Sequence, residues 1–401
     1  MTVQLHLTEY APITLPAAAI STEIGSFIHE KYGRYIDIVF PSPRTQNQWR
    51  LTALGWVGHL PLPQQGQITI HTKVPVSNLW DMLMWVYDWQ SWRHFPGLVQ
   101  TDSLPAFYDG LAYRLAEQVI ELARRGLYGQ YHPQQQRQTT VRGRIQLTPT
   151  LKKPADIGLV CRYDQYTRDN LHNQILNLTL AHIGRSGWCT AATQQQINRA
   201  RRALPHTTTP AEIPWQTLTY TRLNEPYRPL HTLCKFFLDG LLPGQHSGTD
   251  TAIPFLINMS RLFEQFVAAW LAAHTPEQYR LKSQERVYLD GNSGRQIAID
   301  LVLYNQVGQS IAVLDTKYKA PDRPDMADIY QITFYAHQQN STAAYLIYPT
   351  ALQVPLNGRN RDVRYQNLTF SLHGDLNQNG KELLLNIIRH TPQGSRVGFG
   401  M

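Results

Sequence analysis

Cysteine is scarce in this chain of 401 residues, and the three cysteines present, Cys161, Cys189 and Cys234, show no CxxC spacing. Zinc knuckles and disulfide frameworks need closely spaced or paired cysteines, so an odd set without such spacing indicates neither class. Free cysteines in small number are typical of a reducing compartment. We therefore expect a cytoplasmic protein.

Long apolar runs are also missing. No uninterrupted apolar stretch approaches ~18 residues, the length that a membrane-spanning helix needs. The opening residues MTVQLHLTEY lack the basic region and apolar core of a signal peptide. The sequence therefore predicts neither a membrane span nor secretion.

Two motifs of common enzyme classes are absent as well. No GxxxxGK[ST] run occurs, so we do not expect this chain to hydrolyse nucleotides itself. None of the 15 histidines forms an HExxH motif or a pair four positions apart, which leaves structural or surface roles as the simplest interpretation.

Composition predicts a globular chain with an anionic partner. Hydrophobic residues make up 42% and charged residues only 16%, which argues against disorder and allows two or three cores. The net charge of +8 favours a polyanion such as nucleic acid, although a modest excess is also common for solubility.

The pattern of strands and helices divides the chain into three parts. Residues 1–96 contain short strand-like runs between Pro/Gly turns and one helical stretch, Asn78–Trp89, and predict a β-rich module. Residues 97–245 form a mainly helical region, with helices predicted at Phe107–Arg125, Asp169–Ser186, Thr193–Ala203 and Pro226–Leu242. Residues 246–401 form the third part, and GQHSGTD (Gly244–Asp250) is the candidate linker.

A basic stretch lies within the middle region, at Arg142, Arg144, Lys152, Lys153 and Arg162. Scattered charges of this kind often form a solvated face, but they also suit contact with phosphates or docking on a partner. The sequence leaves both interpretations open.

Two acids and a lysine lie in the run Ile297–Tyr318, which reads IAIDLVLYNQVGQSIAVLDTKY. Asp300 belongs to the first of two strand-like stretches, and Asp315 and Lys317 belong to the second. Because side chains alternate between the faces of a strand, Asp315 and Lys317 project together. Antiparallel pairing through the polar turn between the stretches would bring Asp300 near them.

This arrangement can be a metal-dependent hydrolytic site. Carboxylate and carbonyl oxygens suit Mg²⁺ or Mn²⁺, and a neighbouring lysine can assist the attacking water or stabilise developing charge. Ordinary strand-end acids beside a solvated lysine are an equally good interpretation from the spacing alone.

The surrounding elements favour the site. A helix predicted at Met326–Gln339 and a strand at Ala343–Pro349 complete the order strand, strand, helix, strand, which is the core order of the PD-(D/E)xK nuclease fold. Gln331 and Tyr335 share a face of that helix, and their side chains can point toward the two acids. Upstream, a helix is predicted at Ile257–Ala273, with Leu262, Phe266 and Trp270 as its apolar stripe. Glu264 lies off this stripe, and it can be either an ordinary surface acid or an extra carboxylate of the site.

Several segments resemble the McrC family, which supplies the endonuclease subunit of modification-dependent restriction systems. The resemblance rests on INMSRLFEQFV (257–267), Asp300 with Asp315-Thr316-Lys317, YQITFYA (330–336), and segments at 68–88, 124–145 and 161–180, so it covers most of the chain. The chain departs from the family's pattern at one position, because Ile299 and not proline precedes Asp300.

The resemblance implies roles for individual residues. Asp300 and Asp315 would be metal ligands, Lys317 the catalytic lysine, and Glu264, Gln331 and Tyr335 supporting residues of the site. It also implies a separate McrB-type AAA+ GTPase hexamer that recognises DNA and translocates. The N-terminal half of the chain, beginning with the β-rich module, would dock on this partner and stimulate its GTP hydrolysis.

Together these observations predict an α+β multidomain protein with a β-rich N-terminal module, a helical middle region and a C-terminal α/β PD-(D/E)xK restriction-endonuclease-like core. We expect a type IV-like restriction endonuclease that hydrolyses double-stranded DNA containing modified cytosine. Its cofactor would be Mg²⁺, held by Asp300, Asp315 and the Thr316 carbonyl. The alternatives are a self-contained repair or junction nuclease that needs no AAA+ partner, and a non-catalytic adaptor.

Overall fold

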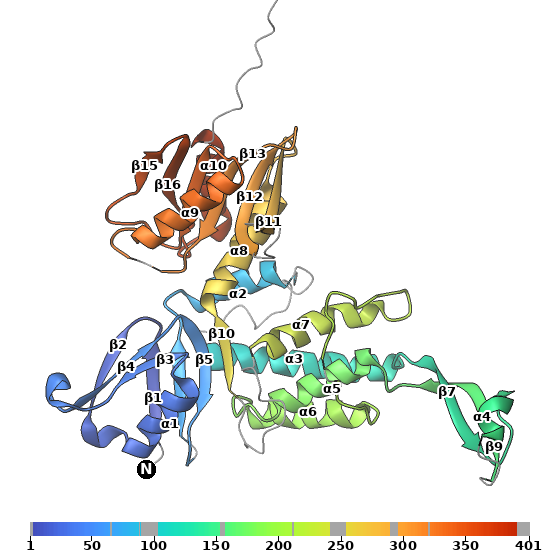
Figure 1. Cartoon of the computed structure of the whole chain (residues 1–401). Coiled ribbons are helices and arrows are strands. Elements are labelled where there is room, and N and C mark those ends of the chain that lie inside the picture. The colour runs from blue at the N-terminus through green and yellow to red at the C-terminus, as the bar shows by residue number, and fades with distance from the viewer. Residues whose placement is uncertain are drawn as a thin grey trace, which may run out of the picture. The chain divides into compact units, whose positions relative to one another are not determined.

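The computed structural model describes residues 3–64, 66–87, 89, 103–152, 157–210, 212–240, 254–288, 296–319 and 321–390. The chain forms two compact units. Figure 1 labels their helices and strands. Unit 1 combines Met1–Leu104 with Pro254–Met401, and unit 2 is Pro105–Ile253. Both units mix helices and strands, so the predicted α+β multidomain character is confirmed.

The N-terminal part of unit 1 contains two small sheets. The four-stranded sheet has the order β1 (Gln4–Thr8), β6 (Gln67–His71), β5 (Trp56–Pro61), β10 (Phe255–Asn258). The three-stranded sheet has the order β2 (Pro12–Pro16), β4 (Gln48–Ala53), β3 (Ile36–Val39). Helices α1 (Thr22–Tyr32) and α2 (Val76–Val86) accompany them. Most of these strands lie in the runs predicted to be strands, whereas α1 was not predicted.

Strand β10 joins the beginning of the chain to its last third. It pairs antiparallel with β5, and helix α8 (Met259–His274) follows directly. Asn258 caps α8 by accepting a hydrogen bond from the Arg261 amide at 3.0 Å. The helix predicted from residue 257 therefore begins two residues later, because the preceding residues complete a sheet.

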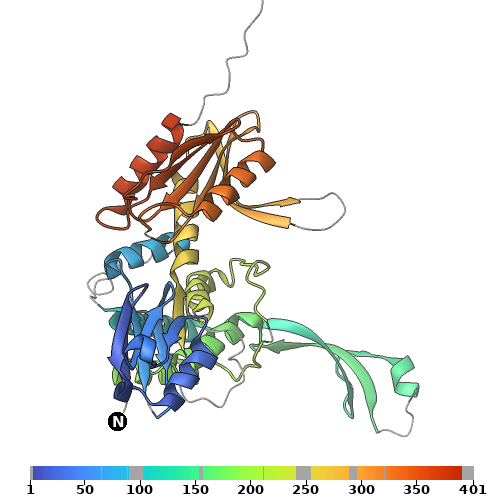
Figure 2. The ribbon, with the colours of Figure 1, turned by 60° about the vertical axis from the view of Figure 1, so that its left-hand side comes forward.

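A six-stranded sheet forms the C-terminal part of unit 1. Its order is β11 (Tyr279–Tyr288), β12 (Gln296–Asn305), β13 (Ser310–Thr316), β14 (Ala343–Tyr348), β16 (Val363–Thr369), β15 (Asn357–Asn360). Strands β13, β14 and β16 are parallel, and the other pairs are antiparallel. Figure 2 shows the sheet between α9 (Met326–Gln338) and α10 (Leu376–His390).

Helices pack against both faces of this sheet. On one face, Ile332 and Ala336 of α9 pack in a buried cluster with Val313 and Leu346. On the other, α8 and α10 pack together: the Trp270 indole donates to Asn377 Oδ1 at 3.1 Å, and a Cβ at Gly380 would come within 2.5 Å of that indole. Burying side chains of this size stabilises the fold by roughly 1.5–3 kcal/mol each. The end of β13 is therefore a rigid place for a site.

Unit 2 contains the four helices that the sequence predicted for the middle region. These are α3 (Leu104–Arg125), α5 (Leu171–Ile183), α6 (Ala191–Ala203) and α7 (Arg228–Asp239). Between α5 and α7, the rings of His172 and His231 stack with centroids 5.3 Å apart. Burial lowers the pKa of His231 to about 3 and also lowers the pKa of His172. Both histidines are therefore neutral core residues.

A long, narrow sheet of three strands, in the order β7 (Gln130–Gln138), β9 (Leu159–Thr167), β8 (Arg144–Ile145), extends from the helices of unit 2 (Figure 2). Strands β7 and β9 pair over nine residues, with β8 and α4 (Leu147–Leu151) between them in the chain. We call residues 130–167 the arm. The sequence pattern identified only its basic residues, of which Lys153 lies outside the described part of the chain.

Both predicted domain boundaries, near residues 96 and 245, and the linker Gly244–Asp250 lie outside the described residues. The division into three parts therefore stays a prediction. Within the described part of the chain, no helix is both long enough and apolar enough to span a bilayer.

Candidate active site

The β12–β13 hairpin places Asp300 beside the end of β13. Leu301 pairs with Leu314 in antiparallel register, so the next residues outward, Asp300 and Asp315, face each other across the two strands. Asp300 Oδ2 accepts hydrogen bonds from the Thr316 amide at 2.9 Å and from the Thr316 hydroxyl at 3.0 Å. The juxtaposition expected from the sequence is thus present in the structure.

Lys317 connects the acids to helix α9. Its Nζ lies 2.8 Å from Asp315 Oδ2 and donates a hydrogen bond to Gln331 Oε1 at 3.0 Å. Gln331 in turn donates from Nε2 to the Tyr335 hydroxyl at 2.7 Å. The i, i+4 spacing of Gln331 and Tyr335 therefore does orient both side chains toward the strand end.

Glu264 reaches the cluster from α8. Its Oε1 accepts a hydrogen bond from Gln284, which has a left-handed backbone (φ 50°) where the pairing of β11 with β12 is interrupted. The charges of Asp300 and Asp315 both raise the pKa of Glu264, so the three carboxylates interact. Glu264, which lies outside the apolar stripe of α8, thus points toward the site and is half-buried.

The electrostatics show an excess of negative charge. Burial, and then the charge of Asp300, raises the pKa of Asp315 to about 6. Burial and the charges of Asp300 and Asp315 raise the pKa of Glu264 to about 7. Burial alone would lower the pKa of Lys317, but the neighbouring acids outweigh it and the pKa is raised. One ammonium does not neutralise this group, and such a site favours an additional cation.

Two further residues of the cluster were missed from the sequence. Asp328 of α9 is buried, with Oδ1 3.9 Å from Lys317 Nζ and Oδ2 2.5 Å from Lys319 Nζ. Burial and the charge of Asp328 raise the pKa of Tyr348, at the end of β14. The signal for Asp328 was its place one turn before Gln331 on the same helix face.

The donor set fits a hard cation with few protein ligands. Among the described residues, no three or more His, Cys, Asp or Glu side chains are grouped to hold a metal ion. Mg²⁺, however, commonly uses one or two carboxylates and fills its other positions with water and substrate oxygens. Asp300 and Asp315 can provide these two. Metal binding and catalysis by the predicted residues, including the Thr316 carbonyl, stay predictions.

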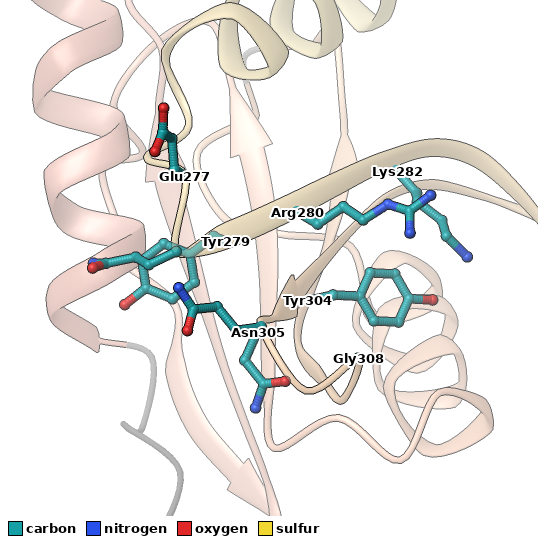
Figure 3. Close-up of a pocket in the computed structure, with 9 residues that line it drawn as sticks. Glu277, Tyr279, Arg280, Lys282, Tyr304, Asn305 and Gly308 are labelled. Atoms are coloured by element: carbon teal, nitrogen blue, oxygen red, sulfur yellow. The ribbon is translucent and has the colours of Figure 1, made fainter.

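A separate polar pocket of about 370 Å³ lies at the start of β11 and the turn after β12 (Figure 3). Arg280, Lys282 and Tyr304 line it, and Lys282 Nζ lies 2.9 Å from Glu285 Oε1. None of the predicted site residues lines this pocket. The candidate active site is therefore the carboxylate–lysine cluster and not this pocket.

Comparisons with known proteins agree on one family. The model of a family described as "McrBC 5-methylcytosine restriction system component" matches residues 51–349. A relative from Escherichia coli strain K12, "Type IV methyl-directed restriction enzyme EcoKMcrBC", is 24% identical over 261 residues, covering 61% of this chain and 73% of the relative.

Solved structures include a similar fold. A chain in a refined half-complex from a tetradecameric assembly of Thermococcus gammatolerans McrB AAA+ hexamers with bound McrC matches with a TM-score of 0.55 and 15% sequence identity. The match covers 96% of this chain and 100% of that one. At this identity the likeness shows a shared fold.

Proposed function

Because this chain belongs to the family of McrBC 5-methylcytosine restriction system components, we propose that it is the endonuclease subunit of such a system. The proposed reaction is Mg²⁺-dependent hydrolysis of phosphodiesters in double-stranded DNA that carries modified cytosine. The observation that carries this proposal is the cluster of Asp300, Asp315 and Lys317 at one strand end, with Lys317 Nζ 2.8 Å from Asp315 Oδ2.

The fold around the cluster supports a PD-(D/E)xK core. Strands β12 and β13, helix α9 and strand β14 follow in the order expected for that nuclease fold, and β13 and β14 are parallel. Asp315 and Lys317 then take the positions of the D-x-K pair at the end of β13.

Each residue has a distinct proposed task. Asp300 and Asp315 would hold a Mg²⁺ ion, which would supply a Lewis acid and lower the pKa of water bound to it. The raised pKa of Lys317 keeps its ammonium protonated at neutral pH, so it offers positive charge to the oxyanion that develops on phosphorus. Gln331, fixed by Tyr335, holds the ammonium in this position.

The partner would be an McrB-type AAA+ GTPase hexamer, and the arm has the features of its docking surface. Exposed apolar side chains are concentrated there, at Tyr131, Val141, Ile145, Leu147, Leu151, Ile157 and Tyr166, with fractions of 37–86%. Exposed arginines accompany them: Arg142 stacks over the Tyr163 ring at 4.3 Å, and Arg144 lies in β8. Exposed apolar side chains on a narrow sheet cannot be buried within the sheet itself. Such a surface is therefore typical of a site that contacts another protein.

The test of the proposed function is a cleavage assay with the purified full chain and Mg²⁺, on methylated and unmethylated DNA, with and without the cognate AAA+ GTPase and GTP. We expect methylation-dependent cutting only when partner and GTP are present. Efficient cutting by the chain alone would instead identify a self-contained nuclease. Stimulation of GTP hydrolysis without any cutting would identify an adaptor.

The arm yields a prediction of its own. Arg144→Glu should lower stimulation of the partner's GTP hydrolysis at least about tenfold, because a reversed charge at a docking surface replaces attraction with repulsion. The measurement is GTP turnover by the partner as the concentration of the full chain is increased.

A matched control is Arg201→Glu, which reverses an exposed arginine on α6 of the same unit. It should stimulate like the unaltered chain. Equal stimulation by Arg144→Glu and Arg201→Glu would remove the arm from the proposed docking surface.

A further inference from the structure

The residue after the predicted catalytic lysine points away from the cluster into a buried contact. Strand β13 ends at Thr316, and the Lys317 amide still donates to the Ile347 carbonyl at 2.8 Å. Since side chains alternate along such a segment, Tyr318 projects to the face opposite Lys317. Tyr318 is 7% exposed, and its ring lies 5.9 Å from that of Phe263 on α8. The position of Lys317 therefore depends on what holds Tyr318.

A carboxylate from the other end of the chain holds it. Glu9 follows β1 and is fully buried. Its Oε1 accepts a hydrogen bond from the Tyr318 hydroxyl at 2.6 Å and another from the Lys73 amide, beyond β6, at 2.9 Å. The mechanism described above does not use this carboxylate, although buried acids are costly and are usually placed for a reason.

The contact joins the N-terminal part of unit 1 to the segment after β13. Tyr10 extends it, with its hydroxyl 3.5 Å from the Tyr318 carbonyl and its ring under the Lys73 ammonium at 4.4 Å. Burial raises the pKa of Glu9 even though the Lys73 amide and the Tyr318 hydroxyl both stabilise the charged form. Loss of the Tyr318 hydroxyl would leave Glu9 with an incomplete set of donors.

We propose that Glu9 is a positioning residue for the candidate active site, which acts by holding Tyr318 and, through the main chain, the Lys317 ammonium. This inference rests on the proposed nuclease function and deepens it. The four-stranded N-terminal sheet, which contains β1 and β6, then affects cleavage through Tyr318: a displacement of Glu9 moves the segment that carries the catalytic lysine. Placement matters here because small shifts of a catalytic group cost large factors in rate.

The experiment compares four variants of the full chain in single-turnover cleavage at saturating DNA and Mg²⁺, with partner and GTP. Tyr318→Phe removes the hydroxyl, and Glu9→Met removes the acceptor oxygens at similar volume. Both should slow cleavage at least about tenfold, with DNA affinity and partner GTP turnover within about twofold of normal. Glu9→Gln keeps an acceptor oxygen and should cleave within about threefold of normal.

The fourth variant is a matched control. Tyr32→Phe removes another buried tyrosine hydroxyl of the N-terminal part, one that donates to the Pro61 carbonyl of β5 at 2.7 Å. It should cleave normally. If Tyr318→Phe does not fold, Glu9→Met against Glu9→Gln gives the same comparison. Normal cleavage by a folded Tyr318→Phe or Glu9→Met variant would overturn the inference.

A double-mutant cycle with Lys317→Ala tests the route of the effect. If Glu9 and Tyr318 act through Lys317, Tyr318→Phe should cause little further loss in the Lys317→Ala background. A full tenfold loss there would show an independent effect and also overturn the inference. Failure of the proposed function looks different, because Lys317→Ala would itself cleave normally.

Discussion

Asp315→Ala is expected to abolish DNA cleavage, with a fall of at least about a thousandfold in the single-turnover rate. Asp315 contributes a buried carboxylate 2.8 Å from the Lys317 ammonium, and β13 contains no other acid that could replace it. Asp300→Ala should behave alike. The measurement is Mg²⁺-dependent nicking and cutting with the cognate partner and GTP present.

The fold should survive this change. In the absence of a cation, burial and the charge of Asp300 raise the pKa of Asp315, so its ionised carboxylate does not stabilise the folded chain. We therefore expect normal thermal unfolding and normal stimulation of the partner. Asp362→Ala, which removes an exposed acid in the turn between β15 and β16 of the same sheet, is the control and should cut normally. Undiminished cutting by Asp315→Ala or Asp300→Ala would remove this cluster from consideration.

The sequence predicted the juxtaposition of Asp300 and Asp315 because that geometry is local. Asp300 and Asp315 belong to neighbouring strands joined by a short turn, so alternation and antiparallel pairing alone bring them together. The shared helix face of Gln331 and Tyr335 followed from helical periodicity in the next element. The structure places Gln331 against Lys317, and Tyr335 against Gln331. Such patterns need no knowledge of the rest of the chain.

The sequence could not predict contacts that depend on distant pairing. Strand β10 is a short run at the start of a helical pattern, and only the presence of β5 makes it a strand. Glu9 looks like an ordinary acid after a strand, and its link to Tyr318 spans 309 positions. The arm has a polar sequence without clear alternation, so only the paired structure reveals β7 and β9.

The second large effect concerns Lys317. Lys317→Ala should slow the chemical step by roughly two decades or more, the usual scale for losing one group that stabilises charge in the transition state. Mg²⁺ binding should persist, because the proposed ligands Asp300 and Asp315 remain and the competing ammonium 2.8 Å from Asp315 is gone. Single-turnover cleavage measures the first quantity, and titration with Mn²⁺ measures the second.

Lys319→Ala is the matched control, since this lysine lies two residues further on and pairs with Asp328 without contacting Asp315. If the charge at the Lys317 position matters, Lys317→Ala slows cleavage and Lys319→Ala does not. Raising the Mg²⁺ concentration should not restore the cleavage rate of Lys317→Ala. A Lys317→Ala chain that cuts normally contradicts the assigned role. A chain that loses metal binding outright contradicts it as well, because Lys317 would then be organising the carboxylates instead of acting on the phosphate.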